Sequence, residues 1–288
     1  MDLGLADATA VVAGGSKGMV RAVAQSLAGE GARIAVLART QVALDETVDA
    51  SRSLGAPDAP GLATDLTSWE SVERALETLG ERWESLNILV NAAGPVDVGI
   101  GLFEDVDDDE WQATFDIGTV SAARCVRAAL PLLRSASWAR IVNISAHSTK
   151  RQSSSIVAYT AAKAALTSLS KNLSGSLAAD GILVNTVSPG SFLSDGLKDY
   201  LRGLPPERHA DPDSLVDAMR VIREDFGHPA LLGRAADPSE IASRCVSVFP
   251  GQHVHDGRES QYRWWFRLYV SRGALREHRD PWPPLLPA

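Results

Sequence analysis

The chain reads ATAVVAGGSKGMV from Ala8 to Val20, and this stretch decides the fold. Its first six residues form a continuous apolar run, which is typical of a strand buried on both faces of a sheet. Glycines then allow a tight turn, and helical spacing begins near Lys17. Such a turn also lets the backbone approach a phosphate, which a helix N-terminus binds through its N–H groups and dipole. The stretch therefore predicts a first strand and helix with a candidate phosphate-binding loop between them.

The same alternation of strand and helix continues along the chain. Short apolar runs predict strands, and longer stretches with helical spacing lie between them. Strands separated by helices pair in parallel, so we expect a doubly wound parallel sheet with helices on both faces, a three-layer α/β/α fold. Asp180-Gly181 is typical of a helix C-terminus. The expected strands are Ala8–Ala13, Arg33–Leu37, Leu86–Val90, Ile141–Ser145 and Ile182–Val187, and the expected helices are Lys17–Ala28, Gln41–Ser53, Ser68–Trp83, Asp109–Leu133 and Val157–Ala179.

The composition excludes several classes of protein. Of the 288 residues, 45% are hydrophobic and 22% are charged, which is too apolar for a disordered chain. The net charge of -8 disfavours nucleic acid or a membrane surface as a partner, because both require surplus Lys and Arg. The two cysteines, Cys125 and Cys245, build no disulfide framework, so a cytoplasmic location is expected. No run approaches the roughly 18 apolar residues of a membrane span, and no Cys/His spacing predicts a metal site.

The alternation lapses between residues 191 and 236. This segment is rich in proline, with helical patches between the prolines. In an open α/β sheet, a long insertion after a late strand usually covers the crevice at the carboxyl ends of the strands. We therefore interpret it as a substrate lid within one domain that spans residues 1–243.

The glycine loop resembles the T-G-x-x-x-G-x-G loop of the short-chain dehydrogenase/reductase family. Gly14 and Gly18 match the first two glycines, whereas Ala13 replaces the threonine and Val20 the last glycine. The nearest resemblance is to 3-oxoacyl-carrier-protein reductases and hydroxysteroid dehydrogenases. It implies a Rossmann fold whose loop binds a dinucleotide through Gly14, Ser16, Lys17, Gly18 and Met19.

The end of the second expected strand indicates which dinucleotide binds. An acidic residue there would bond the adenosine ribose 2′-hydroxyl and select NAD(H). The strand instead ends in Leu37-Ala38-Arg39, without a carboxylate. Arg39 and Lys17 are placed to bind a 2′-phosphate as cations, so NADP(H) is favoured over NAD(H).

Three further segments match the family in order. Ala63-Thr64-Asp65-Leu66 occupies the place of its adenine contact, and Asn91-Ala92-Ala93-Gly94 matches its N-N-A-G segment at three of four positions. The third segment is Val187-Ser188-Pro189-Gly190. The resemblance assigns to the cofactor the residues Asp65, Leu66, Asn91, Ala92, Gly94, Pro189 and Gly190.

Tyr159-Thr160-Ala161-Ala162-Lys163 carries the predicted chemistry. Residues at i and i+4 share one helical face, so Tyr159 and Lys163 are neighbours. Reduction of a carbonyl needs a proton donor at the developing alkoxide, and a free phenol titrates near pH 10. The family resemblance implies that Tyr159 is the acid/base, that Lys163 lowers its pKa, and that both contact the nicotinamide dinucleotide.

Two other positions depart from the family pattern. The serine that bonds the substrate oxygen stands thirteen residues before the tyrosine in the family, where this chain has Ala146. Ser145 takes that role if the loop carries one extra residue, and Ser148 is the alternative. The family asparagine of the preceding helix falls on Gly118, which removes a member of the proton relay.

The implied function is hydride transfer between NADP(H) and a ketone or secondary alcohol. The resemblance suggests a 3-oxoacyl, steroid-like or polyketide-like substrate and assembly as a homodimer or homotetramer. The alternative is a dinucleotide-binding protein with impaired catalysis, because Val20, Gly118 and Ala146 all depart from the family.

The resemblance stops near Ser243. Family members close with a helix, a final strand and an Asp-Gly-Gly segment, whereas residues 244–288 are rich in Arg and Trp. Tryptophan has the single codon TGG, so reading Arg263-Trp264-Trp265-Phe266 one base later permits Asp followed by a forced Gly-Gly. We hypothesise a single-base frameshift near Ser243, with a genuinely divergent C-terminus as the alternative. In both cases the sheet is expected to lack its final strand, which exposes the neighbouring edge.

Overall fold

Six parallel strands form one sheet in the order β3-β2-β1-β4-β5-β6. The computed structural model describes residues 3–14, 17–95, 99, 101–152, 154–227 and 230–247, and structural statements concern these residues. The expected doubly wound parallel sheet is confirmed, since consecutive strands lie on both sides of β1. The strands are β1 Thr9–Ala13, β2 Arg33–Ala38, β3 Gly61–Ala63, β4 Ile88–Asn91, β5 Ala139–Ile144 and β6 Ile182–Val187.

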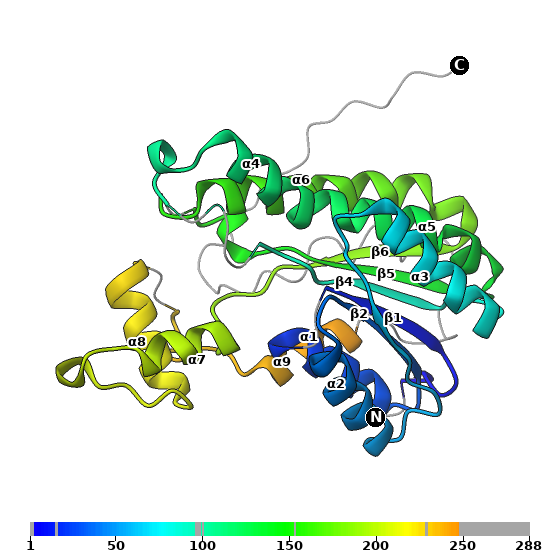
Figure 1. Cartoon of the computed structure of the whole chain (residues 1–288), viewed down its shortest axis with the longest axis horizontal. Helices are drawn as coiled ribbons and strands as arrows, with labels where there is room; N and C mark the ends of the chain where they lie inside the picture. The colour runs from blue at the N-terminus through cyan, green and yellow to red at the C-terminus, as the bar shows by residue number, and fades with distance from the viewer. Residues whose placement is uncertain are drawn as a thin grey trace, which may run out of the picture. The chain divides into compact units, whose positions relative to one another are not determined.

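Helices cover both faces of this sheet (Figure 1). On one face α1, α2 and α9 pack against the strands, and on the other α3, α5 and α6 do so. Every residue of β1, β4 and β5 is buried, which explains why these strands read as continuous apolar runs. The helices are α1 Gly18–Gly29, α2 Gln41–Ser53, α3 Trp69–Arg82, α4 Asp108–Phe115, α5 Ser121–Ser135, α6 Val157–Ser176, α7 Asp195–Arg202, α8 Leu215–Phe226 and α9 Pro238–Val246.

The helical stretch expected at Asp109–Leu133 contains a wider turn. The π-helical turn Asp116–Val120 joins α4 to α5. Gly118 lies in this turn against α6, and a Cβ there would stand 2.9 Å from the Ala162 Cβ. Thr119 Oγ1 donates to the Ala162 carbonyl oxygen at 2.6 Å. The small residue and the wider turn together bring this helical segment close to α6.

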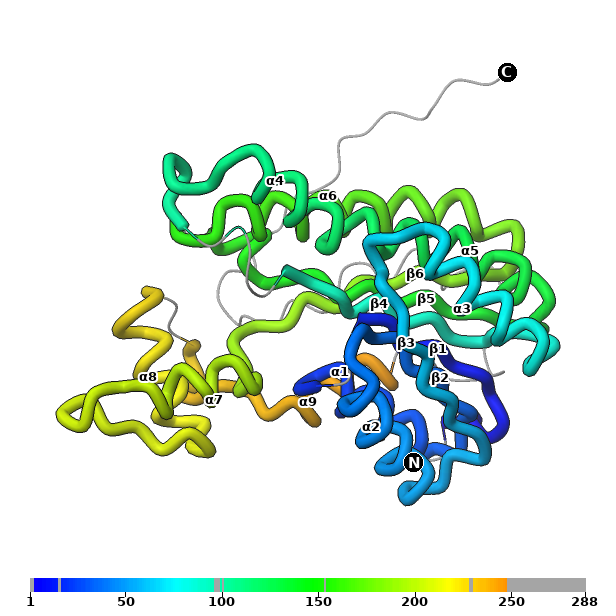
Figure 2. The backbone as a smooth tube through the Cα atoms, in the orientation of Figure 1, coloured from blue at the N-terminus to red at the C-terminus, as the bar shows by residue number. Residues whose placement is uncertain are grey.

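The insertion at residues 191–236 has an apolar core of its own, formed around α7 and α8 by residues such as Leu201, Met219 and Val221. The chain enters and leaves it side by side (Figure 2), because Phe192 and Ala236 form a parallel bridge. Leu193 N–H donates to the Ala236 carbonyl oxygen at 2.9 Å. These two bridged segments connect the insertion to the rest of the chain.

The C-terminal expectations lie mostly outside the described residues. Helix α9 is described to Val246, and everything from residue 248 onward, including the proposed frameshifted tail, is not. Within the described residues β6 is an edge strand of the sheet. None of the described helices combines the length and apolarity that crossing a lipid bilayer requires.

Asp58 fastens the end of α3 to the loop before β3. Its carboxylate accepts hydrogen bonds from Arg82 Nε and Nη2, both at 2.6 Å, and from Trp83 Nε1 at 2.9 Å. The hydrogen bond from Arg82 is the largest contribution that holds the Asp58 pKa below its ordinary value of 3.8.

Replacing Asp58 by alanine is expected to lower the free energy of unfolding by about 1.5–3 kcal/mol, the usual range for hydrogen bonds to a charged group. The loss should be present in full above the ordinary carboxyl pKa and disappear as the pH falls through the lowered one. Urea denaturation at several pH values measures it. Asp49→Ala is the control, because the Asp49–Arg52 pair is exposed and 3.8 Å apart; an equal loss in both variants would contradict the assignment.

Candidate active site

The glycine loop lies at the carboxyl end of β1, beside the segment that follows β4. Gly14 has φ +110°, and any side chain there would overlap the backbone nitrogen of Ala93. The β1 end is tied to the same segment, because Ala92 N–H donates to the Ala13 carbonyl oxygen at 2.8 Å. The first glycine is therefore required by a close approach of two loops.

Helix α1 begins at Gly18, which has φ +51°. Met19 and Val20 are buried in the core beneath α1, and Lys17 is exposed. Ser16, which the sequence assigns to the cofactor, lies outside the described residues. Val20, which stands where the family motif has its third glycine, is therefore part of the apolar core.

A carboxylate from the insertion reaches the start of α1. Gly18 N–H donates to Asp195 Oδ2 at 3.0 Å, across 177 positions of sequence. Asp195 begins α7, directly after its N-cap residue Ser194. The sequence does not predict this contact, because an acidic residue in a first helical turn is ordinary and nothing local indicates a distant partner. The contact shows that this N–H holds an anionic oxygen.

The residues assigned to the adenosine half lie at the ends of β2 and β3. Arg39 is exposed directly after β2, and the cation contributes to the low pKa of Asp65. Hydrogen bonds from the side chain and the backbone of Thr67 are the larger causes of that lowered pKa. Asp65 therefore turns its carboxylate toward Thr67, while the neighbouring Leu66 is buried.

Further predicted cofactor residues lie at the carboxyl ends of β4 and β6. Asn91 is buried and its Nδ2 donates to Asn143 Oδ1 at 2.8 Å, so it joins β4 to β5. Gly94 stands against Lys163, since a Cβ there would lie 3.3 Å from Lys163 Nζ. Pro189 and the exposed Gly190 follow β6 at the same edge.

Lys163 is buried at this edge of the sheet. Its Nζ donates to the carbonyl oxygens of Ala93 at 2.8 Å and Ile144 at 2.9 Å, just beyond β4 and at the last residue of β5. The side chain is 3% exposed, and this burial lowers the pKa of Lys163 to about 8. Two carbonyl dipoles thus hold an ammonium group where the strand ends meet.

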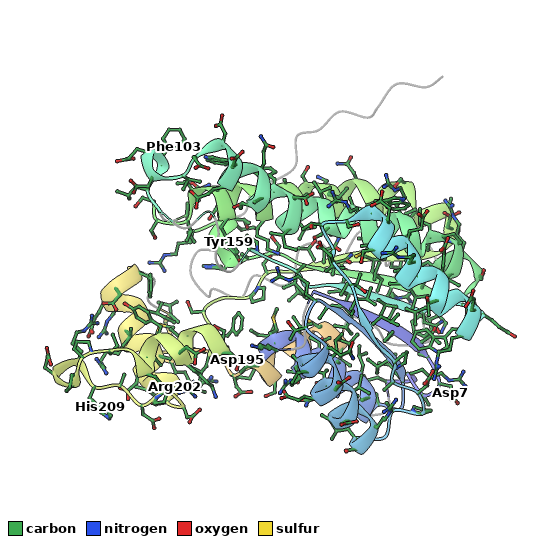
Figure 3. All side chains as sticks on the ribbon, viewed as in Figure 1. Asp7, Phe103, Tyr159, Asp195, Arg202 and His209 are labelled. Carbon is green, nitrogen blue, oxygen red and sulfur yellow. The ribbon has the colours of Figure 1, made fainter. Side chains whose placement is uncertain are left out.

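Tyr159 lies one helical turn before Lys163, near the end of the sheet from which the insertion extends (Figure 3). The side chain is half-buried, and burial raises the pKa of its phenol. The expected lowering by Lys163 is not present in the chain alone, because the ammonium is turned to the carbonyls of Ala93 and Ile144. Tyr159 therefore keeps its proton at neutral pH.

Ser145 points into α6. Its Oγ donates to the Lys163 carbonyl oxygen at 3.0 Å and lies 2.7 Å from Thr167 Oγ1. Ala146 follows with a buried methyl group. Ser148 lies in the 3₁₀ turn His147–Thr149, and its buried Oγ has no hydrogen-bond partner among the described residues. The hydroxyl of Ser145, which the sequence favours, is thus hydrogen-bonded to α6, whereas the hydroxyl of the alternative, Ser148, has no partner among the described residues.

Comparisons with known proteins identify the family. The family described as short chain dehydrogenase matches residues 8–203. The chain belongs to the short-chain dehydrogenase family. It is 31% identical over 249 residues to the rhamnolipids biosynthesis 3-oxoacyl-[acyl-carrier-protein] reductase of Pseudomonas aeruginosa, covering 85% of this chain and 90% of that protein. As a short-chain dehydrogenase, it is an oxidoreductase that depends on a nicotinamide dinucleotide.

Two solved structures share the fold of this short-chain dehydrogenase. L-sorbose reductase from Gluconobacter frateurii, complexed with NADPH and L-sorbose, has a TM-score of 0.78 and 25% identity, covering 87% of this chain and 92% of that one. The RhlG/NADP complex from Pseudomonas aeruginosa has a TM-score of 0.74 and 29% identity, covering 86% and 91%.

An apolar crevice of about 270 Å³ lies between the insertion of this dehydrogenase and the start of α6. Ile156, directly before α6, forms one side, only three residues before Tyr159. Phe192 lines the crevice from the segment that leads into the insertion, and Ile222 and Phe226 line it from α8. The sequence located the insertion but not these residues, because apolar residues at helical spacing also fit the insertion's own core.

Proposed function

We propose that this short-chain dehydrogenase interconverts a ketone and a secondary alcohol with NADP(H). One observation carries the proposal: the buried Lys163 ammonium is held between the carbonyls of Ala93 and Ile144, one turn beyond a half-buried, protonated Tyr159. Burial of a charge is costly unless its hydrogen bonds are made, so this arrangement is typical of a site rather than of a surface.

The residues at the sheet edge fit a dinucleotide. Gly14 leaves no side chain in the loop, and the Asp195 carboxylate on Gly18 N–H is a stand-in for an anionic phosphate oxygen. Arg39 and Lys17 are exposed cations suited to a 2′-phosphate, which supports NADP(H) over NAD(H). The solved relatives complexed with NADPH and NADP point the same way.

The mechanism assigns separate tasks to the two residues of α6. When bound, the dinucleotide supplies or accepts the hydride at the carbonyl carbon. Tyr159 Oη gives its proton to the carbonyl oxygen in reduction and takes it back in oxidation. The ketone, one hydride and one proton together give the secondary alcohol. Lys163 holds its ammonium group at the strand ends, one helical turn from Tyr159, where it would bind the cofactor ribose, and Asn91, Gly94, Pro189 and Gly190 would line the cofactor site.

The crevice favours an apolar substrate. Ile156, Phe192, Ile222 and Phe226 line it, and the insertion that carries three of them serves as the substrate lid. The relative that is named a 3-oxoacyl-carrier-protein reductase supports a 3-oxoacyl chain or a similarly apolar steroid-like or polyketide-like ketone. The expected assembly as a homodimer or homotetramer through α5 and α6 stays a prediction, which light scattering tests.

Titration and turnover test the proposal together. Fluorescence titration with NADPH and NADH measures binding, and we expect NADPH to bind at least about tenfold tighter, the effect of one or two charge-assisted phosphate contacts. Consumption of NADPH with acetoacetyl-CoA, trans-1-decalone, a 3-ketosteroid and L-sorbose measures turnover. Equal affinity for both dinucleotides contradicts the cofactor assignment, and turnover of L-sorbose alone contradicts the apolar substrate class.

A second candidate is a dinucleotide-binding protein with impaired catalysis. The bonded Ser145 hydroxyl and the methyl group of Ala146 favour it, since neither offers a free donor to a substrate oxygen. Tight NADPH binding without turnover, unchanged by Tyr159→Phe, would support this candidate over the first.

Replacing Asp195 by asparagine is expected to tighten NADPH binding. The carboxylate must leave Gly18 N–H before a phosphate oxygen binds there, and removal of its charge removes both competition and repulsion. We expect the Kd to fall about two- to fivefold, which corresponds to the usual strength of a charge at a helix N-terminus. Asp199→Asn, on the same helix and paired with exposed Arg202, is the matched control. An unchanged or higher Kd for the Asp195 variant would rule out the competition.

Raising the pH from 7 to 9 is expected to weaken NADPH binding about tenfold. Lys163 has a pKa lowered to about 8, so its ammonium is present below that pH and lost above it, whereas Arg39 stays charged throughout. Titrations at each pH measure the effect. Lys163→Met should bind NADPH more weakly at pH 7, and its NADPH affinity should no longer depend on pH. If the Kd rises equally with pH in both proteins, Lys163 is not part of the cofactor site.

A further inference from the structure

The apolar crevice has a fixed wall at its inner end, on the side of Tyr159. Ile156 lines the crevice directly before α6, three residues before the phenol. The backbone there is held in place, because Gly101 N–H donates to the Ser155 carbonyl oxygen at 2.9 Å and Gly101 forms a parallel bridge with Ile156. Phe192, which also lines the crevice, packs against the core of the sheet. An apolar group that enters beside the phenol therefore meets firmly held side chains first.

Helix α8 lines the crevice from its buried part to solvent. Ile222 and Phe226 lie four residues apart, so they share one face of α8 and are separated by about 6 Å along its axis. Ile222 is 7% exposed, whereas Phe226, the last residue of the helix, is 43% exposed. Gly227 follows with φ +67° and ends α8 at that point. The crevice therefore runs along α8, with the ring of Phe226 at its solvent end.

The size of the crevice distinguishes between the ketones that its apolar lining would accept. Its volume of about 270 Å³ lies below the roughly 300–1,000 Å³ of pockets that hold drug-sized ligands. A rigid system of several fused rings is a ligand of that size, whereas a linear chain needs length but little width. Each methylene group that such a chain buries between apolar walls adds to its affinity. The crevice therefore fits a linear hydrocarbon chain better than a polycyclic ketone.

We propose that the substrate ketone is carried on a linear acyl chain and that the Phe226 ring sets the longest chain that the crevice takes. The inference rests on the proposed ketone reductase function, and it names the shape of the substrate and the residue that selects it. With the carbonyl group at Tyr159, the chain passes Ile156 and Ile222 and ends against Phe226. A half-exposed phenyl ring covers on the order of 100 Å² of apolar surface, which is the area of about three methylene groups.

Turnover of a series of 3-oxoacyl-CoA thioesters, from acetoacetyl-CoA to 3-oxotetradecanoyl-CoA, tests the inference. In the unmodified chain kcat/KM should rise about fourfold with each added methylene group until the acyl chain reaches Phe226, and then stay level. Phe226→Ala should move this break to chains about two to four carbons longer, and Phe226→Trp should move it to shorter chains. The NADPH Kd and the kcat with acetoacetyl-CoA should stay unchanged in both variants, because neither ligand reaches the ring.

Phe103→Ala is the matched control and should keep the break of the unmodified chain. Phe103 is 70% exposed and is not one of the residues that line the crevice (Figure 3). The same break in Phe226→Ala as in the unmodified chain overturns the inference and leaves the ketone reductase function intact. An equal loss at every chain length, together with a lower Tm, shows a structural role of the ring and also overturns it.

Two further outcomes separate the inference from the proposed function. If the unmodified chain reduces trans-1-decalone or the 3-ketosteroid but none of the thioesters, the linear chain is wrong and the ketone reductase function stands. If it reduces no ketone of either series, the proposed function fails and the inference fails with it.

Discussion

Replacing Tyr159 by phenylalanine is expected to lower kcat/KM for ketone reduction about 10³-fold, within the range for a positioned general acid. The substitution removes only the phenolic oxygen from a half-buried ring, so the packing of α6 is retained. The NADPH Kd should change less than about threefold, because one hydrogen bond between the Tyr159 hydroxyl and the cofactor contributes only modestly to binding. Stopped-flow absorbance of NADPH measures turnover, and fluorescence titration measures binding.

The pH dependence sharpens this prediction. Burial raises the pKa of Tyr159, so the phenol is protonated across the neutral range and reduction should proceed there. Alcohol oxidation needs the phenolate, and its rate should rise about tenfold per pH unit below that pKa. Tyr159→Phe should abolish this slope. Tyr200→Phe is the control, because its hydroxyl bonds Asp225 in the insertion and is remote from the sheet edge; comparable losses in both variants contradict a special role of Tyr159.

Replacing Gly14 by alanine is expected to reduce NADPH affinity more than about 100-fold, because a displaced loop forfeits several backbone contacts to phosphate. The new Cβ would overlap the Ala93 backbone, and φ +110° is a conformation that alanine rarely adopts. The loops after β1 and β4 must separate to accommodate it, which also disturbs the Ala93 carbonyl that holds Lys163. A fall in Tm accompanies the loss, since left-handed strain and overlap both destabilise the native state.

Gly29→Ala provides the matched control for Gly14. Gly29 is the last residue of α1, the helix that follows the glycine loop; it is exposed, and a Cβ there would meet nothing within 4 Å. Alanine should leave NADPH affinity unchanged and keep or raise the Tm. If Gly14→Ala binds NADPH as tightly as Gly29→Ala, the glycine loop is not the phosphate site.

The sheet was predictable because its signals are local. The runs around Val11, Leu89 and Val142 are apolar on both faces. Asp180-Gly181 predicts a helix C-terminus, whereas α6 ends at Ser176 and Gly181, with φ +72°, ends the 3₁₀ turn Ala178–Asp180 that follows. The turn at Asp116–Val120 was not predictable, because one extra residue in a helical turn barely changes the apolar spacing.

The site was predictable only as a set of residues near one sheet edge. Spacing placed Tyr159 and Lys163 on one helical face, but it did not show that the Lys163 ammonium turns to two carbonyls or that burial raises the pKa of the phenol. Position in the motif favoured Ser145, whereas the contacts with Thr167 that engage it come from the tertiary fold. The Asp195–Gly18 contact joins distant segments and has no local signature.

We expect the carbonyl carbon of a ketone to receive hydride from a dinucleotide bound near Tyr159 and Lys163. Transfer of deuterium to the ketone from NADPH that carries deuterium at both C4 positions is the test, with mass spectrometry of the alcohol as the readout. We expect one deuterium on the carbinol carbon with the unaltered chain, and none with Tyr159→Phe over the same time. Full NADPH binding without any labelled alcohol from the whole ketone panel would contradict it.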